Sequence, residues 1–301
     1  MIPKSQTLTH FIFSDAQPGQ AFTDLKEVGL TKKMDVKVPK DNNPNYLTDM
    51  VVITSNNILI VDGWNNSVKL MDVQTGCQLS HVQLPGRPWR LCLLPGDRAA
   101  VSLPSEKAIQ KIDVSADQLK LLDSVHVEGE CKCLAYMNNT FIVDFRGQHC
   151  VATLNMEGQL LKSVTKDNMG NELFKNPYYI CVTAEKNASS IYVSDIDTRT
   201  ITQLNEELDL LKTFKAPNVV VPGVLATAGG GQLLVRAWGP DNHRLWVLDT
   251  STGVFTELSV GLLGEEGSRA KEGCVAFCSR LGRLHVNIGN ENEVIRLYEL
   301  S

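Results

Sequence analysis

The stretch ILIVDGWNNSVKLMD (residues 58–72) decides the fold, because variants of it recur through the chain. An apolar run ends in an acidic or polar residue, passes through a short turn, and enters a second alternating run. The other copies are residues 98–113, 140–155, 190–205, 232–249 and 283–300. The residues that follow the apolar run, Asp62, Ser102, Asp144, Asp195, Arg236 and Asn287, recur about every 40–50 positions. This period, built from short strands, predicts an all-β fold: a six-bladed β-propeller with four antiparallel strands per blade.

The last repeat stops after its third strand, at the final residue, Ser301. An alternating segment near the start, KKMDVKVP (residues 32–39), offers the missing outer strand. We expect this N-terminal strand to close the last blade, because an open blade would leave unpaired strand edges. The predicted organisation is therefore an N-terminal extension over residues 1–31 and a propeller over residues 32–301.

Composition limits the classes of partner. The chain has 301 residues, 43% of them hydrophobic, which is enough for one propeller with a filled core. Its formal net charge of −5 favours neither nucleic acid nor membrane surfaces as a general partner. No apolar run is long enough to cross a bilayer, and the first residues do not resemble a signal peptide. We therefore expect a cytoplasmic protein without membrane association.

The eight cysteines follow the repeat instead of a disulfide framework. The equivalent position of the first strand of each repeat is small and apolar: Met50, Cys92, Cys133, Cys181, Val224 and Cys274. Successive members belong to different blades, so neither a disulfide nor a shared metal site is expected. We expect free thiols that pack as small hydrophobic groups in a reducing compartment.

Aromatic and arginine side chains gather in the turns of one propeller face, where second strands meet third strands and fourth strands meet first strands. We call this the loop face. Its candidate partner-binding residues are Tyr46, Trp64, Asn65, Arg87, Trp89, Arg90, Phe145, Arg146, Tyr178, Arg199, Trp238 and His243. Trp, Tyr and Arg dominate the energetics of protein interfaces. The alternative is that each ring only fills space in its own blade or at the mouth of the central channel.

Catalytic, metal and cofactor sites are not predicted. Asp62, Asp144 and Asp195 end strands just before turns, where a carboxylate accepts backbone N–H groups. The residues that enter the first strands are Asp49, Arg90, Lys132, Tyr178, Pro222 and Glu272, which make a poor calcium cage. A calcium-dependent, lactonase-like hydrolase is therefore the less favoured interpretation, and we expect no catalytic residues, no metal and no cofactor.

Single-stranded RNA is the main alternative ligand. The loop face carries cations beside its aromatic rings, as RNA-binding surfaces do. Acidic residues such as Glu106, Glu130 and Asp197 occur in the same turns, and they lower phosphate affinity. The pattern therefore favours a protein partner over RNA.

The repeats resemble the NHL family, whose units carry a hydrophobic strand ending in V-D or V-x-D before an Asn/Arg-containing turn. The matching segments are IVDGWNNSVKLMD, FIVDFRGQHCVATLN and IYVSDIDTRTITQLN, whereas Ser102 and Arg236 replace the acid in two repeats. The chain is similar to the divergent NHL-type propellers that end invertebrate TRIM (tripartite motif) proteins, which are RING, B-box and coiled-coil ubiquitin ligases. This resemblance implies a non-catalytic substrate-recognition domain. Zinc would be bound only by domains of the parent protein that this sequence lacks.

Overall fold

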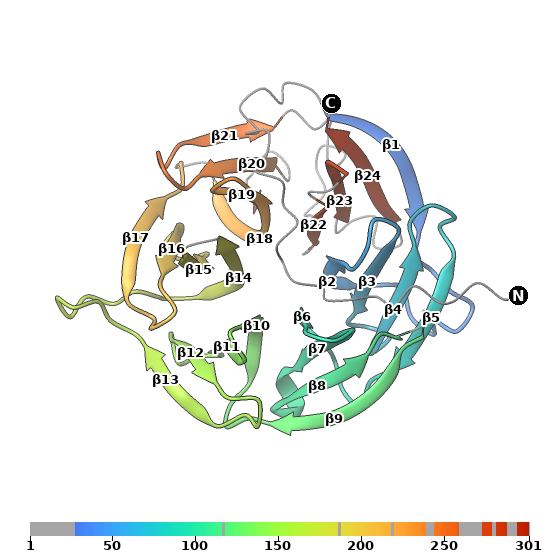
Figure 1. Cartoon of the computed structure of the whole chain (residues 1–301), viewed down its shortest axis with the longest axis horizontal. Helices are drawn as coiled ribbons and strands as arrows, with labels where there is room; N and C mark the ends of the chain where they lie inside the picture. The colour runs from blue at the N-terminus through green and yellow to red at the C-terminus, as the bar shows by residue number, and fades with distance from the viewer. Residues whose placement is uncertain are drawn as a thin grey trace, which may run out of the picture.

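The computed structural model describes residues 28–115, 118–185, 188–217, 220–238, 244–258, 273–278, 281–287 and 294–300. The fold is all-β, with six sheets of four antiparallel strands arranged in a ring (Figure 1). Helix in the described residues is limited to one short 3-10 turn, Pro104–Glu106. The predicted six-bladed β-propeller is confirmed.

Each blade runs from an inner strand at the ring axis to an outer strand at the rim. Blade one contains β2 (Leu47–Val52), β3 (Asn57–Asp62), β4 (Ser67–Asp72) and β5 (Gln78–Gln83), and blade two contains β6 (Leu91–Leu94), β7 (Arg98–Leu103), β8 (Ala108–Asp113) and β9 (Lys120–His126). Blade three contains β10 (Cys131–Met137), β11 (Thr140–Phe145), β12 (Val151–Leu154) and β13 (Leu160–Val164). Blade four contains β14 (Pro177–Glu185), β15 (Ala188–Asp195), β16 (Thr200–Leu204) and β17 (Leu210–Lys215). Blade five contains β18 (Val221–Gly229), β19 (Gln232–Trp238), β20 (Arg244–Asp249) and β21 (Phe255–Leu258), and blade six contains β22 (Val275–Cys278), β23 (Arg283–Asn287), β24 (Val294–Leu300) and β1 (Val28–Asp35).

The N-terminal strand closes the ring as predicted. Strand β1 pairs antiparallel with β24, from Val28 opposite Leu300 to Asp35 opposite Val294, and lies at the outer edge of blade six (Figure 1). The pairing of β1 with β24 shifts register between Leu30 and Lys32, and regular pairing resumes after this irregularity. The predicted strand, residues 32–39, is displaced from the observed one, because β1 begins at Val28 and ends at Asp35. The register shift breaks the alternation of apolar residues in the first half of β1, so the pattern alone marked the later residues.

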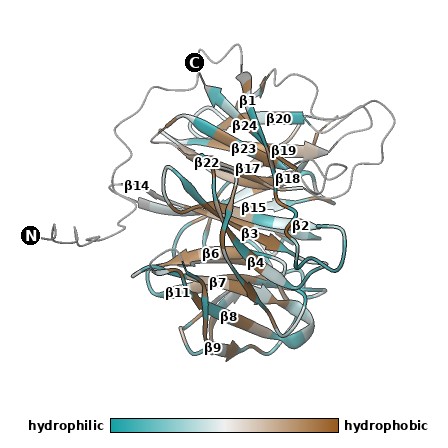
Figure 2. Cartoon of the chain, turned by 90° about the vertical axis from the view of Figure 1, so that its right-hand side faces the viewer, coloured by the Kyte–Doolittle hydropathy of each residue, from teal (hydrophilic) through white to brown (hydrophobic). Residues whose placement is uncertain are grey.

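The core consists of clusters between neighbouring blades. In one of them, Met34 and Val36 from the N-terminal segment pack with Leu47 and Met50 of blade one and Ile295 of blade six. All five side chains are buried. Figure 2 shows apolar residues concentrated in the strands and hydrophilic residues in the turns. The ring is therefore held together by hydrophobic contacts between consecutive blades.

All eight cysteines are free thiols. Cys92, Cys133 and Cys274 are buried in the clusters between blades, as the repeat predicts. Cys181 differs, because it is only partly buried. Burial raises the pKa of the Cys92, Cys133 and Cys274 thiols, which keeps them protonated and poorly reactive.

Within the described ranges, no helix has the length and hydrophobicity needed to span a membrane.

Candidate functional site

Aromatic rings and one arginine stack where blade one meets blade two on the loop face. The rings of Tyr46 and Trp64 are parallel, with centroids 5.1 Å apart and an interplanar angle of 17°. Trp89 lies on the other side of Tyr46, with ring centroids 6.3 Å apart. The Arg87 guanidinium carbon is 5.2 Å from the centre of the Tyr46 ring and 5.6 Å from that of Trp89. These distances are typical of cation–π contacts.

The stack continues towards the ring axis and into blades three and four. Lys132 Nζ is 4.7 Å from the centre of the Trp89 ring and 4.9 Å from that of Tyr178. The Arg90 guanidinium carbon lies 5.0 Å from the Tyr178 ring and 4.8 Å from the Tyr179 ring. We call this arrangement the cation–aromatic ladder; its members are Trp64, Tyr46, Arg87, Trp89, Lys132, Tyr178, Arg90 and Tyr179.

The carboxylate of Asp62 positions the outer end of the ladder. Asp62 Oδ1 accepts hydrogen bonds from the backbone N–H groups of Tyr46 (3.1 Å), Trp64 (3.2 Å) and Asn65 (3.3 Å). Its other oxygen accepts from Lys69 Nζ at 2.9 Å. The strand-ending acid therefore fixes the two backbone segments that carry the stacked Tyr46 and Trp64 rings.

Lys69 extends this support to the N-terminal segment. Its buried ammonium group donates to Asp41 Oδ2 at 2.7 Å and to Asn45 Oδ1 at 2.9 Å, in addition to Asp62. It also donates to the backbone oxygen of Val36 at 3.3 Å. A buried ammonium group needs this number of partners to offset its lost hydration.

Gly63 provides the space that the ladder needs. A Cβ atom at this position would lie 3.0 Å from Thr48 Cγ2 and 3.1 Å from Tyr46 Cδ1. Both contacts are tighter than ordinary van der Waals distances, so a side chain here would push on the Tyr46 ring. Glycine at position 63 is therefore part of the geometry of the site.

The inner end of the ladder lies at the central channel. The Tyr179 hydroxyl donates to Asp49 Oδ1 at 3.1 Å, and Asp49 Oδ2 accepts from the backbone N–H of Leu91 at 2.9 Å. Arg90 donates to the backbone oxygens of Thr48 and, at 3.5 Å, of Tyr178. Burial raises the pKa of the Asp49 carboxyl to about 6, although the neighbouring Arg90 favours its ionised form.

Exposure divides the ladder into contact residues and supporting residues. Arg87 is exposed, and Trp64, Trp89 and Lys132 are partly exposed. Tyr46, Arg90 and Tyr178 are buried, so they shape the surface without presenting much of their own area. Within the described ranges, the guanidinium of Arg87 has no hydrogen-bond acceptor, and neither has Trp89 Nε1. Arg87 therefore retains donors for a bound partner, whereas Trp89 Nε1 is buried and offers only the exposed part of its ring.

The structure brings together seven of the twelve predicted site residues: Tyr46, Trp64, Asn65, Arg87, Trp89, Arg90 and Tyr178. Asn65 acts within the loop, where its side chain accepts from the backbone N–H of Asn43 and donates to Asp62. This bonding makes Asn65 a positioning residue of the turn.

The remaining predicted residues lie elsewhere. In blade three, Phe145 is buried beside Gly129, and Arg146 is exposed with its Nη1 3.5 Å from Glu130 Oε2. Arg199 is exposed in a blade-four turn, at a positive φ of 57°. The backbone of Trp238 ends β19, but its side chain and the whole of His243 lie outside the described residues.

Two members of the ladder, Lys132 and Tyr179, were not among the predicted site residues. Lys132 was placed at the axis by the repeat, as one of the residues that enter the first strands. Tyr179 follows Tyr178 in β14, and neighbouring strand residues point to opposite sides. A search for cations and aromatic rings at the residues that enter the first strands, and at the residue after each of them, would have found Lys132 and Tyr179.

The strand-ending acids have backbone partners, as predicted. Asp195 accepts four backbone N–H groups, from Lys175 and Asn176 on one side and from Asp197 and Thr198 on the other. The Asp144 carboxylate accepts the backbone N–H of Cys133. In the part of the chain that the structure describes, no cluster of His, Cys, Asp and Glu could hold a metal ion. Asp195 therefore stabilises its turn, whereas Asp144 bonds to the neighbouring strand β10 instead of the turn that follows it.

Comparison with known proteins supports the fold and no specific family. The sequence matches no protein family and no curated protein. The structure is similar to the β-propeller domain of Cps50 (Swd1) from Myceliophteria thermophila, with a TM-score of 0.58, 13% identity, and coverage of 85% of this chain and 83% of that one. It is also similar to hydrazine synthase of Kuenenia stuttgartiensis, with a TM-score of 0.60, 10% identity, and coverage of 83% and 76%. The chain thus has the architecture of a β-propeller, which is consistent with a protein-binding module.

Proposed function

We propose that this chain is a non-catalytic recognition module that binds a protein segment on its loop face, at the outer part of the cation–aromatic ladder. The observation that carries this proposal is the stack of Trp64, Tyr46, Arg87 and Trp89. A bound segment would place an apolar or proline side chain against Trp64 or Trp89. Its carboxylate or backbone carbonyl would accept hydrogen bonds from Arg87.

The ladder is held in place before any partner binds. Asp62 fixes the backbone of Tyr46 and Trp64, and Lys69 anchors Asp62 from below. Binding therefore requires little ordering of these side chains, which preserves affinity. Large rings and an arginine in a fixed arrangement are the usual composition of interface hot spots.

RNA is less well supported by the same surface. Arg87 is the exposed cation of the ladder, whereas Arg90 is buried and Lys132 lies between two rings. The Glu106 side chain packs over Gly86, next to Arg87 in the chain. An acidic group at this point repels phosphates, and Arg87 is the one exposed cation among the eight ladder residues.

The NHL and TRIM resemblance refines the proposal. We propose that the parent protein is a TRIM-like ubiquitin ligase and that this domain selects its substrate in a reducing, cytoplasmic compartment. Holding a substrate near a ubiquitin-loading domain would raise its effective concentration without any chemistry in this chain. The buried free thiols support the reducing compartment.

Affinity capture with matched variants tests the proposal. Wild-type domain is compared with the Trp64→Ala, Arg87→Ala double variant, each with and without nuclease. The control double variant, Leu161→Ala with Leu211→Ala, removes exposed apolar side chains from the outer strands β13 and β17. We expect nuclease-resistant protein partners that the control retains and the ladder variant loses. Partners that the ladder variant retains, or that nuclease releases, would contradict the proposal.

A further inference from the structure

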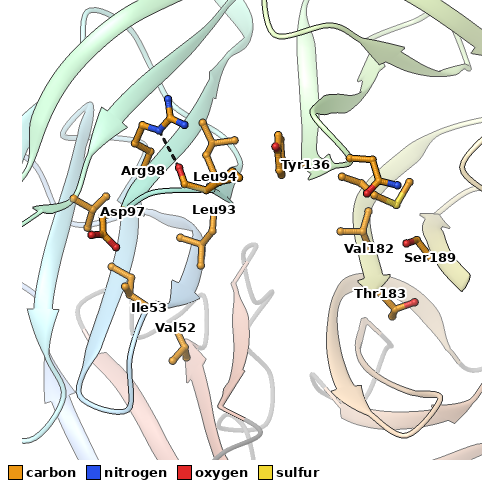
Figure 3. Close-up of a pocket in the computed structure, with 14 residues that line it drawn as sticks. Val52, Ile53, Leu93, Leu94, Asp97, Arg98, Tyr136, Val182, Thr183 and Ser189 are labelled. Atoms are coloured by element: carbon orange, nitrogen blue, oxygen red, sulfur yellow. Dashed lines mark hydrogen bonds between the residues drawn. The ribbon is translucent and has the colours of Figure 1, made fainter. Parts of the chain in front are cut away.

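A cavity of about 490 Å³ opens on the face opposite the loop face, between blades one and four. It forms where the inner strands end, with Val52 and Ile53 in blade one, Leu93 and Leu94 in blade two, Tyr136 and Met137 in blade three, and Val182 and Thr183 in blade four. Figure 3 shows Tyr136 between the leucines of blade two and Val182 of blade four. We call this cavity the lower vestibule.

The lower vestibule opens into the central channel. A second cavity of about 300 Å³ is lined by the middle residues of all six inner strands. The two cavities share Val52, Leu93, Tyr136 and Val182, which form the neck between them. Tyr179 lines the channel and binds Asp49 across it, so a molecule entering from the lower vestibule would meet a polar barrier.

The walls and the rim of the lower vestibule differ in chemistry. The walls are aliphatic apart from the ring of Tyr136, whose hydroxyl has no hydrogen-bond partner in the described part of the chain. The rim carries the polar side chains of Asp97, Arg98, Asn138, Thr183 and Ser189. Arg98 Nε is already bonded to the backbone oxygen of Pro95, at 2.9 Å.

The charges of the described rim residues balance. Asp97 and Arg98 are adjacent residues of opposite sign, and Asn138, Thr183 and Ser189 are neutral. A charged head group would lose hydrating water at the rim, and the described rim residues carry no excess of opposite charge to compensate for that loss. A neutral head would find hydroxyl and amide partners.

We infer that the lower vestibule is a binding site for a small neutral amphiphile. The apolar body of the ligand packs against the leucines and valines of the neck. Its hydroxyl or amide head bonds to Thr183, Ser189 or Asn138 at the rim. The volume falls within the range of about 300–1,000 Å³ that is usual for small-molecule sites. This site is separate from the loop face, and its test is independent of the proposed function.

Calorimetric titration with three probes of equal tail length tests both the site and its preference for a neutral head. The probes are decanol, kept below its aqueous solubility limit, and decanoate and decyltrimethylammonium, each kept below its micelle concentration. We expect decanol to bind with one-to-one stoichiometry and at least about tenfold more tightly than either charged probe. No binding of decanol, or equal binding of all three probes, would overturn the inference.

Matched substitutions locate the bound probe. Val182→Phe fills the neck, and Val254→Phe makes the same change at an exposed position in the turn after β20. We expect Val182→Phe to weaken decanol binding at least about tenfold and Val254→Phe to leave it unchanged. Thr183→Trp fills the cavity from the rim and replaces Val182→Phe if that variant does not fold. Unchanged decanol affinity in a folded filling variant would show that the probe binds elsewhere.

Discussion

The Tyr179 hydroxyl of blade four donates a hydrogen bond to the Asp49 carboxylate of blade one, at 3.1 Å. These blades face each other across the ring (Figure 1). The bond between them therefore crosses the central channel. It separates the ladder on the loop face from the apolar channel below. The same carboxylate accepts a backbone N–H from Leu91 of blade two. Asp49 therefore ties three blades together at the axis.

The raised pKa of Asp49, about 6 instead of 3.8, predicts a specific pH dependence of stability. The folded state keeps the proton up to about pH 6, whereas the unfolded chain releases it near pH 3.8. The stability from this group is therefore fully present below about pH 4 and is lost as the pH rises to about 6. Between about pH 4 and pH 6, we expect the free energy of unfolding of wild type to fall by up to about 3 kcal/mol relative to that of Asp49→Asn.

Urea unfolding of both proteins at a series of pH values checks this prediction. His285 acts in the opposite direction, because burial lowers its pKa to about 4 and its contribution is lost as the pH falls. His285 is present in both proteins, so its effect cancels in the difference. If the difference in free energy of unfolding between wild type and Asp49→Asn stays constant from about pH 4 to pH 7, the prediction is contradicted.

Lys69→Met should destabilise the propeller strongly. The substitution leaves the buried carboxylates of Asp41 and Asp62 without their shared cation. Removing one partner of a buried ion pair costs about 3–5 kcal/mol. The control is Lys111→Met, whose partner Asp123 is 69% exposed, and it should cost below about 1 kcal/mol. Chemical denaturation measures both variants. If Lys69→Met and Lys111→Met lower the free energy of unfolding equally, the buried network of Lys69 is not what stabilises blade one.

Truncation tests the closure of the ring. Deleting residues 1–27 leaves β1 intact and should leave the melting temperature nearly unchanged. Deleting residues 1–39 removes β1 together with the buried Met34, Val36 and Val38, and it exposes the edge of β24. An open strand edge and a lost hydrophobic cluster predict unfolding or aggregation. Similar melting temperatures and solubility for both truncations would refute this role of β1.

Thiol labelling distinguishes the exposed cysteine from the packed ones. Cys77 is exposed and should react first with a maleimide, and the partly buried Cys181 should follow slowly. Burial raises the thiol pKa of Cys92, Cys131 and Cys274, so these should resist labelling in the native state. Intact mass over time gives the result, with Cys77→Ser as the control that lacks the first adduct. If several maleimide groups were added to wild type at the earliest times, the buried cysteines would not be packed as the structure shows.

The repeat was sufficient to predict the blades, because each blade is specified locally. The turn after Asp62 and the turn after Asp195 are both built by a carboxylate that accepts nearby N–H groups. The closing segment was predictable in part: the buried Met34, Val36 and Val38 alternate with polar residues, but only Met34 lies in β1, which ends at Asp35. The turns depend on contacts between residues close together in the sequence. The need for a closing strand follows from counting the strands of the last repeat.

The contacts at the axis were not predictable in the same way. Tyr179 and Asp49 are 130 positions apart, and only closure of the whole ring brings them together. The partners of Lys69 depend likewise on where the N-terminal segment lies after β1. The sequence indicated aromatic and arginine residues on one face. It could not indicate which of them stack, which are buried, and which remain available to a partner.

Photocross-linking from the edge of the ladder tests the central claim, protein recognition by the loop face, most directly. A photoreactive residue replaces exposed Glu106, which lies over Gly86 beside Arg87 but outside the ladder, and the control position is exposed Leu161 on β13. We expect nuclease-resistant protein adducts from position 106 that are absent from position 161. Adding Trp64→Ala and Arg87→Ala should abolish them. RNA adducts at position 106, or protein adducts that persist in the double-alanine background, would contradict the account.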